Sequence, residues 1–104
     1  MKNNFKMLSI WIFFFSGTLF NDFPDLTNKE DLVDLGVGKI IEKDQSIIIK
    51  ITLFEINENA IIYIKNESMH DIAISEIDKI EFPKSKWGAI RIRFLNSKPQ
   101  IERY

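Results

Sequence analysis

The segment from Ile47 to Phe82 constrains the fold of this chain more than any other. It consists of short runs rich in isoleucine and other β-branched residues, and polar turns separate the runs. Runs of this length and composition, bounded by Asn, Asp and Ser, are typical of antiparallel strands. With 104 residues and no cysteine, the chain has room for one small domain without disulfides or thiolate chemistry. We therefore expect a single, mainly β domain over residues 22–104.

The first 21 residues have a different composition. Lys2 and Lys6 make the start basic, and the 14 residues at 7–20 (MLSIWIFFFSGTLF) contain no charge. A basic start followed by an apolar core is typical of a secretory signal peptide. As a helix the apolar core would be about 21 Å long, short of the ~30 Å hydrocarbon layer. We expect residues 1–21 to be a cleaved signal peptide and the protein to be exported to the periplasm or cell envelope. An uncleaved membrane anchor and a buried apolar segment are the alternatives.

One short helix is predicted before the strands, at about residues 28–35. Thr27 and Glu30 fit a capping box with Thr27 as N-cap, and Gly36 is placed to end the helix. Pro83 is expected to end a strand, and residues 66–70 to form a loop that contains His70. The predicted strands occupy residues 37–43, 47–56, 60–65, 71–75 and 89–95, with a short extended segment at 80–82 and a short final edge strand at 100–104. Together they predict a small antiparallel barrel of five to six strands.

Two irregularities in the apolar pattern predict where the sheet bends. Odd positions are apolar from Ile47 to Leu53, which predicts that Ile47, Ile49, Ile51 and Leu53 share one face, and the pattern changes phase at Phe54. Because a strand has period two, this change predicts a bulge or sharp bend near Leu53 and Phe54. Ile77 and Ile80 are three positions apart, which fits one helical turn better than a strand. A bent strand of this kind favours a closed barrel over a flat sheet.

Two stretches of the chain resemble known small β modules. The text IIEKDQSIIIKITLFEINENAIIY at residues 40–63, followed by IAISEIDKIEF at 72–82, resembles Sm-like or SH3-like barrel modules of exported bacterial proteins of unknown function. The resemblance implies a small barrel with a helix before its strands. Here Gln45 and Ser46 stand where such modules have a turn glycine.

A second resemblance, to bacterial pleckstrin-homology-like (PH-like) domains, extends further along the chain. It includes INENAIIY at 56–63, IAISEIDKIE at 72–81 and GAIRI at 88–92. It implies a barrel closed by a C-terminal helix and a role at a membrane surface. Residues 95–104 contain Pro99 and are too short for that helix, so the Sm-like or SH3-like resemblance is favoured. Neither resemblance carries over a catalytic residue.

The charges are unevenly distributed along the chain. Residues 22–82 carry six basic and fourteen acidic side chains, a sum of −8, whereas residues 83–104 carry six basic and one acidic side chain, a sum of +5. Such a division can attract an anionic partner, or the two parts can neutralise each other within one domain.

The best candidate binding patch lies in the basic part of the chain. It consists of Lys84, Lys86, Trp87, Arg91 and Arg93. The two arginines share one face of a predicted strand, and Trp87 lies in the preceding turn. Basic groups beside an aromatic ring can meet an anionic lipid surface. Because export makes nucleic acid an implausible partner, none is expected. The simpler alternative is that the arginines pair with Glu on a neighbouring strand.

No residue pattern predicts catalysis, a metal site or a cofactor site. His70 is the only histidine, and its neighbour Asp71 would point to the opposite face of a strand. The carboxylates near Ile77 and Ile80 are expected to be solvated charges; they are Glu76, Asp78 and Glu81. We expect a non-enzymatic binding or structural module that takes a protein partner, with a PH-like module on anionic lipid as the alternative.

Overall fold

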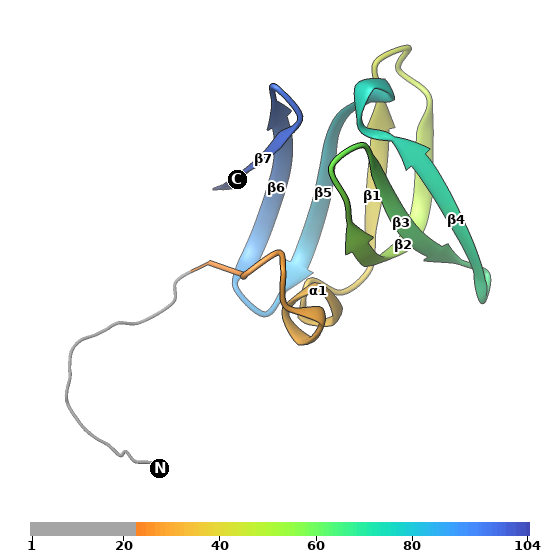
Figure 1. Ribbon diagram of the computed structural model, residues 1–104. Helices are drawn as coiled ribbons and strands as arrows, with labels where there is room; N and C mark the ends of the chain where they lie inside the picture. The colour runs from red at the N-terminus through yellow and green to blue at the C-terminus, as the bar shows by residue number, and fades with distance from the viewer. Residues whose placement is uncertain (1–22) are drawn as a thin grey trace, which may run out of the picture.

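The domain is a seven-stranded antiparallel sheet with one short α-helix (Figure 1). A computed structural model of the chain describes residues 23–104, and the predicted signal segment at 1–21 lies outside the described residues. In chain order the elements are α1 (Lys29–Asp34), β1 (Gly38–Glu42), β2 (Ile47–Ile56), β3 (Ala60–Lys65), β4 (Ser68–Ala73), the 3₁₀ helix η1 (Ile74–Glu76), β5 (Ile77–Ser85), β6 (Gly88–Leu95) and β7 (Lys98–Arg103). The mainly β fold with one short helix agrees with the sequence prediction.

The sheet is open, and its strand order is β4-β3-β2-β1-β5-β6-β7. This differs from the expected closed barrel of five to six strands. A barrel made of the first five strands would need β4 to pair with β5. Instead β5 takes β1 on one side and β6 on the other, and the β6–β7 hairpin then continues the sheet outward. The second neighbour of β5 thus occupies the hydrogen-bonding groups that closure would need.

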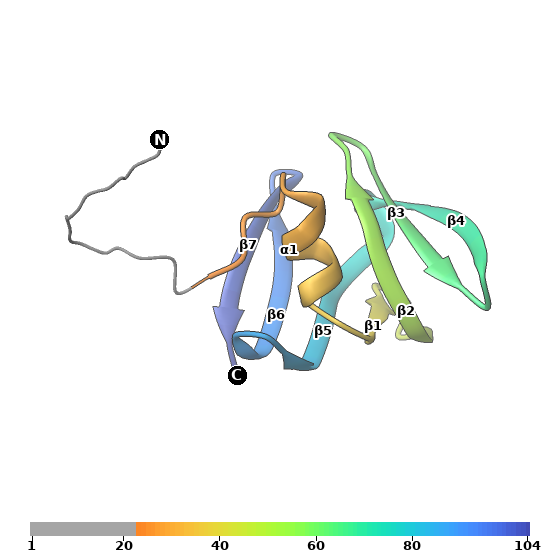
Figure 2. The ribbon, with the colours of Figure 1, turned by 90° about the horizontal axis from the view of Figure 1, so that it is seen from below.

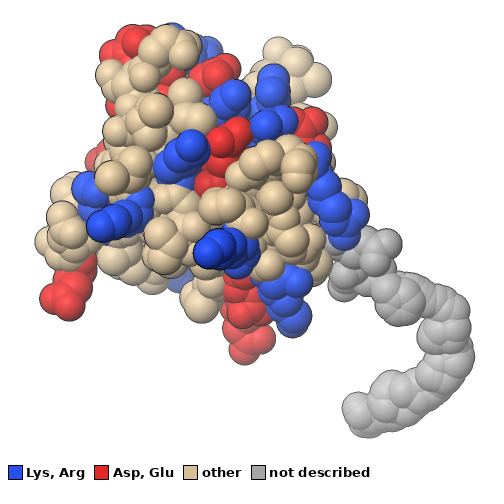
Figure 3. Space-filling model, turned by 180° about the vertical axis from the view of Figure 1, so that it is seen from behind, with Lys and Arg blue, Asp and Glu red and all other residues tan. Residues whose placement is uncertain are grey.

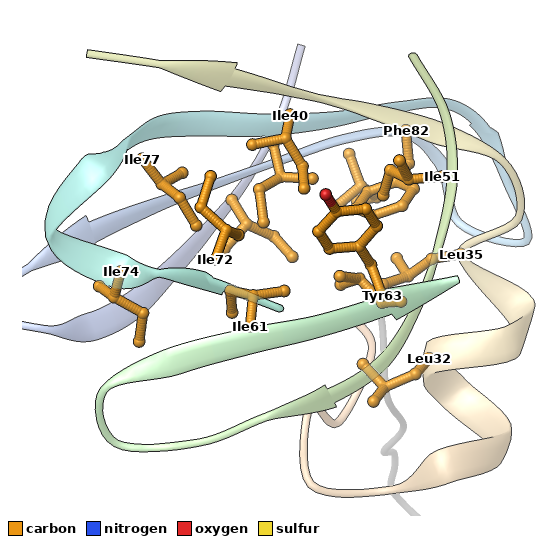
Figure 4. Close-up of a cluster of buried hydrophobic side chains, with 14 residues drawn as sticks. Leu32, Leu35, Ile40, Ile51, Ile61, Tyr63, Ile72, Ile74, Ile77 and Phe82 are labelled. Atoms are coloured by element: carbon orange, nitrogen blue, oxygen red, sulfur yellow. The ribbon is translucent and has the colours of Figure 1, made fainter. Parts of the chain in front are cut away.

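A single apolar core lies on the concave face of the curved sheet. Figure 2 shows α1 between the β2–β3–β4 part of the sheet and the β6–β7 part. Figure 4 shows Tyr63 of β3 reaching toward Ile51 and Phe82, so the core joins the two parts. The buried cluster consists of Leu32, Leu35, Ile40, Ile51, Leu53, Ile61, Tyr63, Ile72, Ile74, Ile77, Ile80, Phe82, Ile90 and Ile92.

The helix begins at a different cap from the predicted one. The Oδ1 atom of Asn28 accepts hydrogen bonds from the backbone N–H groups of Glu30 (2.8 Å) and Asp31 (3.4 Å). Thr27 instead donates its hydroxyl to Asp25 Oδ1 at 2.7 Å, so Thr27 is not the N-cap. Asn and Thr are both good caps, and the Asp25 contact decides between them. The end of the helix is as predicted, because Gly36 has a φ of +76° and its N–H bonds to the carbonyl of Val33.

Strand β2 contains two bulges, of which the sequence predicted one. The register against β3 shifts between Leu53 and Glu55, which confirms the predicted bend at Phe54. The register against β1 also shifts, because Ile49 and Lys50 together oppose one residue of β1 and Lys50 has a φ of +59°. This second bulge inverts the faces. The prediction that Ile47 and Ile49 share a face with Ile51 is therefore wrong: Ile51 is buried, whereas Ile47 and Ile49 are about half exposed.

The segment from β4 to β5 differs from the prediction in three places. Asn66 and Glu67 alone form the turn, both with positive φ, so β4 begins at Ser68 and His70 lies in a strand. The predicted helical turn at Ile77 and Ile80 is wrong, because both are residues of β5. The register of β5 against β1 shifts between them, which marks a bulge. The 3₁₀ helix η1 ends just before Ile77. Strand β5 continues past Pro83 because β1 pairs with β5 only as far as Glu81, so the missing N–H of proline breaks no bond there.

Candidate binding face

The sheet surface opposite the core carries most of the charge of the C-terminal strands, and we call it the outer face. It is formed by β2, β1, β5, β6 and β7, whose outward residues alternate with the core residues. Figure 3 shows this side of the molecule: basic side chains surround a central acidic group, and uncharged surface lies between them. Its charged residues are Lys39, Lys50, Lys79, Glu81, Arg91, Arg93 and Glu102.

Four of these side chains form a charged row across the sheet. Strand register places Lys39 opposite Glu81, Glu81 opposite Arg91, and Arg91 opposite Glu102. Signs alternate along the row, so each residue faces an opposite charge on the next strand. Arg91 holds both carboxylates, with its Nε 3.0 Å from Glu81 Oε2 and its Nη1 3.0 Å from Glu102 Oε2. The predicted alternative, arginines paired with Glu on neighbouring strands, is what the contacts show.

Glu81 is the most buried charged group of the outer face, with 8% of its surface exposed. Besides Arg91, its carboxylate meets Lys39 Nζ at 3.8 Å and Lys79 Nζ at 4.0 Å. Three cations therefore surround one carboxylate. The hydrogen bonds from Arg91 to Glu102 and Glu81 raise the pKa of Arg91, which keeps the guanidinium charged.

An open pocket of about 350 Å³ lies beside the charged row. Its lining includes Val37, Lys39, Ile49, Lys50, Pro83 and Tyr104. Glu81 contributes to the same lining, so the pocket adjoins the row directly. The ring of Tyr104 lies 4.5 Å from the Arg91 Cζ, and burial raises the pKa of the Tyr104 phenol. We call this hollow the outer-face pocket.

The predicted patch divides into two groups in the structure. Arg91 and Arg93 lie together on the outer face, where Arg93 Nε is 3.4 Å from Glu102 Oε2. Lys86 and Trp87 form the β5–β6 turn at the end of the sheet near α1. There Lys86 pairs with Asp34 at 3.7 Å, and Trp87 packs partly buried against the core.

Lys84 lies at the same end of the sheet as this turn, where its backbone carbonyl faces Gly36 at the end of the helix. The two arginines therefore belong to a different surface from Trp87. Trp87 is used in packing, as its position in the partly buried layer around the core shows.

Sequence reasoning did not mark Lys50, Ile49 or Tyr104. The available signal was the single lysine inside the run IIIKI at 47–51, because a charge in an isoleucine run is a place where the strand can change phase. The structure shows that change as the bulge at Lys50, which brings Ile49 and Lys50 to the outer-face pocket.

Comparison of the chain with protein-family models, with curated proteins and with solved structures gives no match. Within residues 23–104, no three His, Asp or Glu side chains are grouped so that they could share a metal ion. Over the same residues, no helix combines the length and apolar character needed to cross a bilayer. Function is therefore inferred from the outer face itself.

Proposed function

We propose that this chain is an exported, non-catalytic binding module whose outer face takes a protein partner. The observation that carries the proposal is the clustering of half-exposed apolar side chains on that face. Val37 is 61% exposed, Ile47 54% and Ile49 52%. Single exposed apolar residues are ordinary on protein surfaces. Here, however, Val37 and Ile49 line one pocket, and Ile47 lies two residues before Ile49 on β2.

The arrangement of charge around these residues supports a protein partner. Specific protein interfaces have an apolar centre and a polar rim, and Arg is enriched in them. On the outer face, the apolar pocket is bordered by the charged row, whose cations are held in place by Glu81 and Glu102. A rim with ordered charges favours recognition of one partner over others.

The position of the helix supports kinship with Sm-like or SH3-like modules over PH-like domains. Helix α1 precedes β1 and docks against β2 through Leu32, as the first resemblance implies. The proposal of export rests on the composition of residues 1–21. Intact-mass measurement on the protein from its own cells tests it, and a mass that still includes residues 1–21 would contradict cleavage.

The alternative function is a membrane-surface module that binds anionic lipid. Four cations on the outer face (Lys39, Lys79, Arg91 and Arg93) meet two carboxylates, which leaves an excess of positive charge. However, a lipid head group would have to compete with Glu81 and Glu102 for the arginines. We therefore rank lipid second.

Photo-crosslinking in living cells tests the protein partner. A benzoyl-phenylalanine residue replaces Ile47 in one variant and Glu58, in the β2–β3 turn, in the control. We expect a discrete protein adduct from position 47 that Ile49→Asp abolishes, and no such adduct from position 58. No adduct at 47, or the same adducts from both positions, would contradict the proposal.

A vesicle assay separates the two functions. The purified protein is sedimented with phosphatidylcholine vesicles that do or do not contain phosphatidylglycerol. We expect no difference between the two vesicle types. Sedimentation that requires phosphatidylglycerol and is lost in Arg91→Glu/Arg93→Glu would favour the lipid function and overturn the protein one.

A further inference from the structure

We infer that the outer-face pocket takes an apolar side chain followed by a carboxylate, presented by a short segment of the partner protein. The inference rests on the proposed function and names the chemistry of the partner. Two features of the pocket carry it: apolar walls with room for a side chain, and a lysine held at its rim in a strained conformation.

The apolar walls lie along one side of the row and at its β2 end. Val37, Pro83 and Tyr104 flank the row on one side, and Ile49 stands at its β2 end beside Lys39. A volume of about 350 Å³ lies at the small end of the range of ligand pockets, which suits one side chain with its adjoining backbone. An inorganic anion or a bare charged group would leave these walls exposed to water.

The strained lysine is the second, independent feature. Lys50 has a φ of +59°, a conformation in which glycine is at ease and an L-residue with a Cβ is strained. Bulges of this kind redirect a side chain, and strained residues are concentrated at binding sites. The bulge places Lys50 in the lining of the pocket, so a cationic residue stands beside the apolar walls.

Lys50 is also available for a ligand. Among residues 23–104 it makes no ion pair, whereas Lys39, Lys79 and Arg91 all share Glu81. The negative charge of Glu81 is thus already compensated by its neighbours. An arriving carboxylate near Lys50 and Lys39 therefore meets a positive rim, and the complementary ligand is anionic.

The size of the face favours a segment over a large folded interface. The area around the pocket is about five strands wide, or about 20 Å, and about six residues long, or about 20 Å, while β2 and β5 run further. Standard interfaces between folded proteins bury about 800 Å² on each partner, more than this face offers around one pocket. A few residues of a partner chain fit it.

Titration of ¹⁵N-labelled protein by NMR with three small probes tests the inference. N-acetyl-leucine carries both the apolar side chain and the carboxylate, N-acetyl-leucine amide lacks the charge, and acetate lacks the side chain. We expect N-acetyl-leucine to shift the amide signals of Gly38, Lys39, Lys50 and Tyr104, and to bind about fivefold more tightly than the amide. Acetate should produce no saturable shift at these amides.

Variants at Lys50 complete the test. Lys50→Gly should bring the preference for the acid over the amide down to about one, and Lys50→Glu should bring it below one because a carboxylate then faces the acid. Lys98→Glu makes the same change of charge in the exposed β6–β7 hairpin, and it should keep the preference. Equal binding of acid and amide by the wild type, shifts elsewhere on the molecule, or a preference unchanged in Lys50→Glu would overturn the inference.

Crosslinking distinguishes failure of the inference from failure of the proposed function. If the adduct from position 47 forms equally in Lys50→Glu cells, the outer face binds a protein but the pocket chemistry is wrong. If no adduct forms in the wild type, the proposed function itself fails. An adduct that forms in the wild type and is lost in Lys50→Glu, but not in Lys98→Glu, supports both.

Discussion

Arg91 and Glu81 face each other across the β5–β6 ladder, with the Arg91 Nε 3.0 Å from Glu81 Oε2. The two residues belong to parts of the chain with opposite net charge, and folding brings these charges together in the middle of the sheet. Part of the charge division seen in the sequence is therefore cancelled within the domain. The positive charge that remains uncompensated on this face lies at the rim of the outer-face pocket.

Removal of the Glu81 carboxylate should destabilise the domain. Glu81→Ala leaves Lys39, Lys79 and Arg91 facing one another without the group that separates them, and we expect a loss of about 2 kcal/mol in the free energy of unfolding. Urea denaturation measures this loss. The control is Glu102→Ala, whose carboxylate is 47% exposed and whose removal should cost less than about 1 kcal/mol. Equal losses in the two variants would contradict a special role for Glu81.

Gly38 should not tolerate a methyl group. A Cβ at this position would lie 2.5 Å from the Glu81 carbonyl oxygen and 2.5 Å from the ring of Phe82, which is fully buried and cannot move aside. Gly38→Ala should therefore cost about 2–3 kcal/mol, as overpacking of a core does. Gly88→Ala is the matched control, because its Cβ meets nothing within 4 Å and only its φ of +91° opposes it. We expect thermal denaturation to give a clearly lower melting temperature for Gly38→Ala than for Gly88→Ala.

Two substitutions distinguish the N-cap predicted from the sequence, Thr27, from the N-cap in the structure, Asn28. If Asn28 is the N-cap, Asn28→Ala should lower the free energy of unfolding by about 1 kcal/mol. Thr27→Ala removes only an exposed bond to Asp25 and should change it by less than about 0.5 kcal/mol. Chemical denaturation measures the free energy of unfolding of both variants. A larger loss in Thr27→Ala than in Asn28→Ala would favour Thr27 as the N-cap.

Tyr63 should make stability fall at high pH. Burial, with a smaller contribution from Glu42 and Asp71, raises the pKa of Tyr63 above its ordinary value of 10.0. The unfolded chain therefore releases this proton before the folded one, so the wild type loses stability as the pH rises through 10. In Tyr63→Phe this loss is absent. Tyr104 titrates in both proteins, so its contribution cancels when the two are compared. Free energies of unfolding measured from pH 8 upward should diverge above about pH 10, and parallel curves would refute the assignment.

The strands of this protein could be predicted well from the apolar pattern. Strand β2 has the predicted bounds, and its bend at Phe54 followed from a change of phase that the sequence displays. The bulge at Lys50 could not be predicted in this way, because isoleucines at 47, 48, 49 and 51 satisfy either face. Only the pairing with β1 decides which of them are buried.

Neither the closure of the sheet nor the set of residues at the candidate site could be predicted from the local apolar pattern. Closure of a five-stranded barrel depends on which strand pairs with the edge of β5 that β1 leaves open. In this fold the hairpin from Gly88 to Arg103 pairs with that edge. The pairing of Arg91 and Arg93 with Glu was open to prediction, since alternation puts both on one face. The division between these arginines and Trp87 was not, because a turn residue has no period that fixes its direction.

The open sheet has two edges, and their chemistry is unequal. Pro99 removes one backbone donor from β7, and Lys98 adds a charge beside it, which are two common defences against strand-to-strand self-association. Strand β4 contains neither proline nor lysine between Ser68 and Ala73, and its Met69 is 58% exposed. Aggregation of the folded protein at high concentration would therefore begin at β4, at the end of the sheet remote from the outer-face pocket.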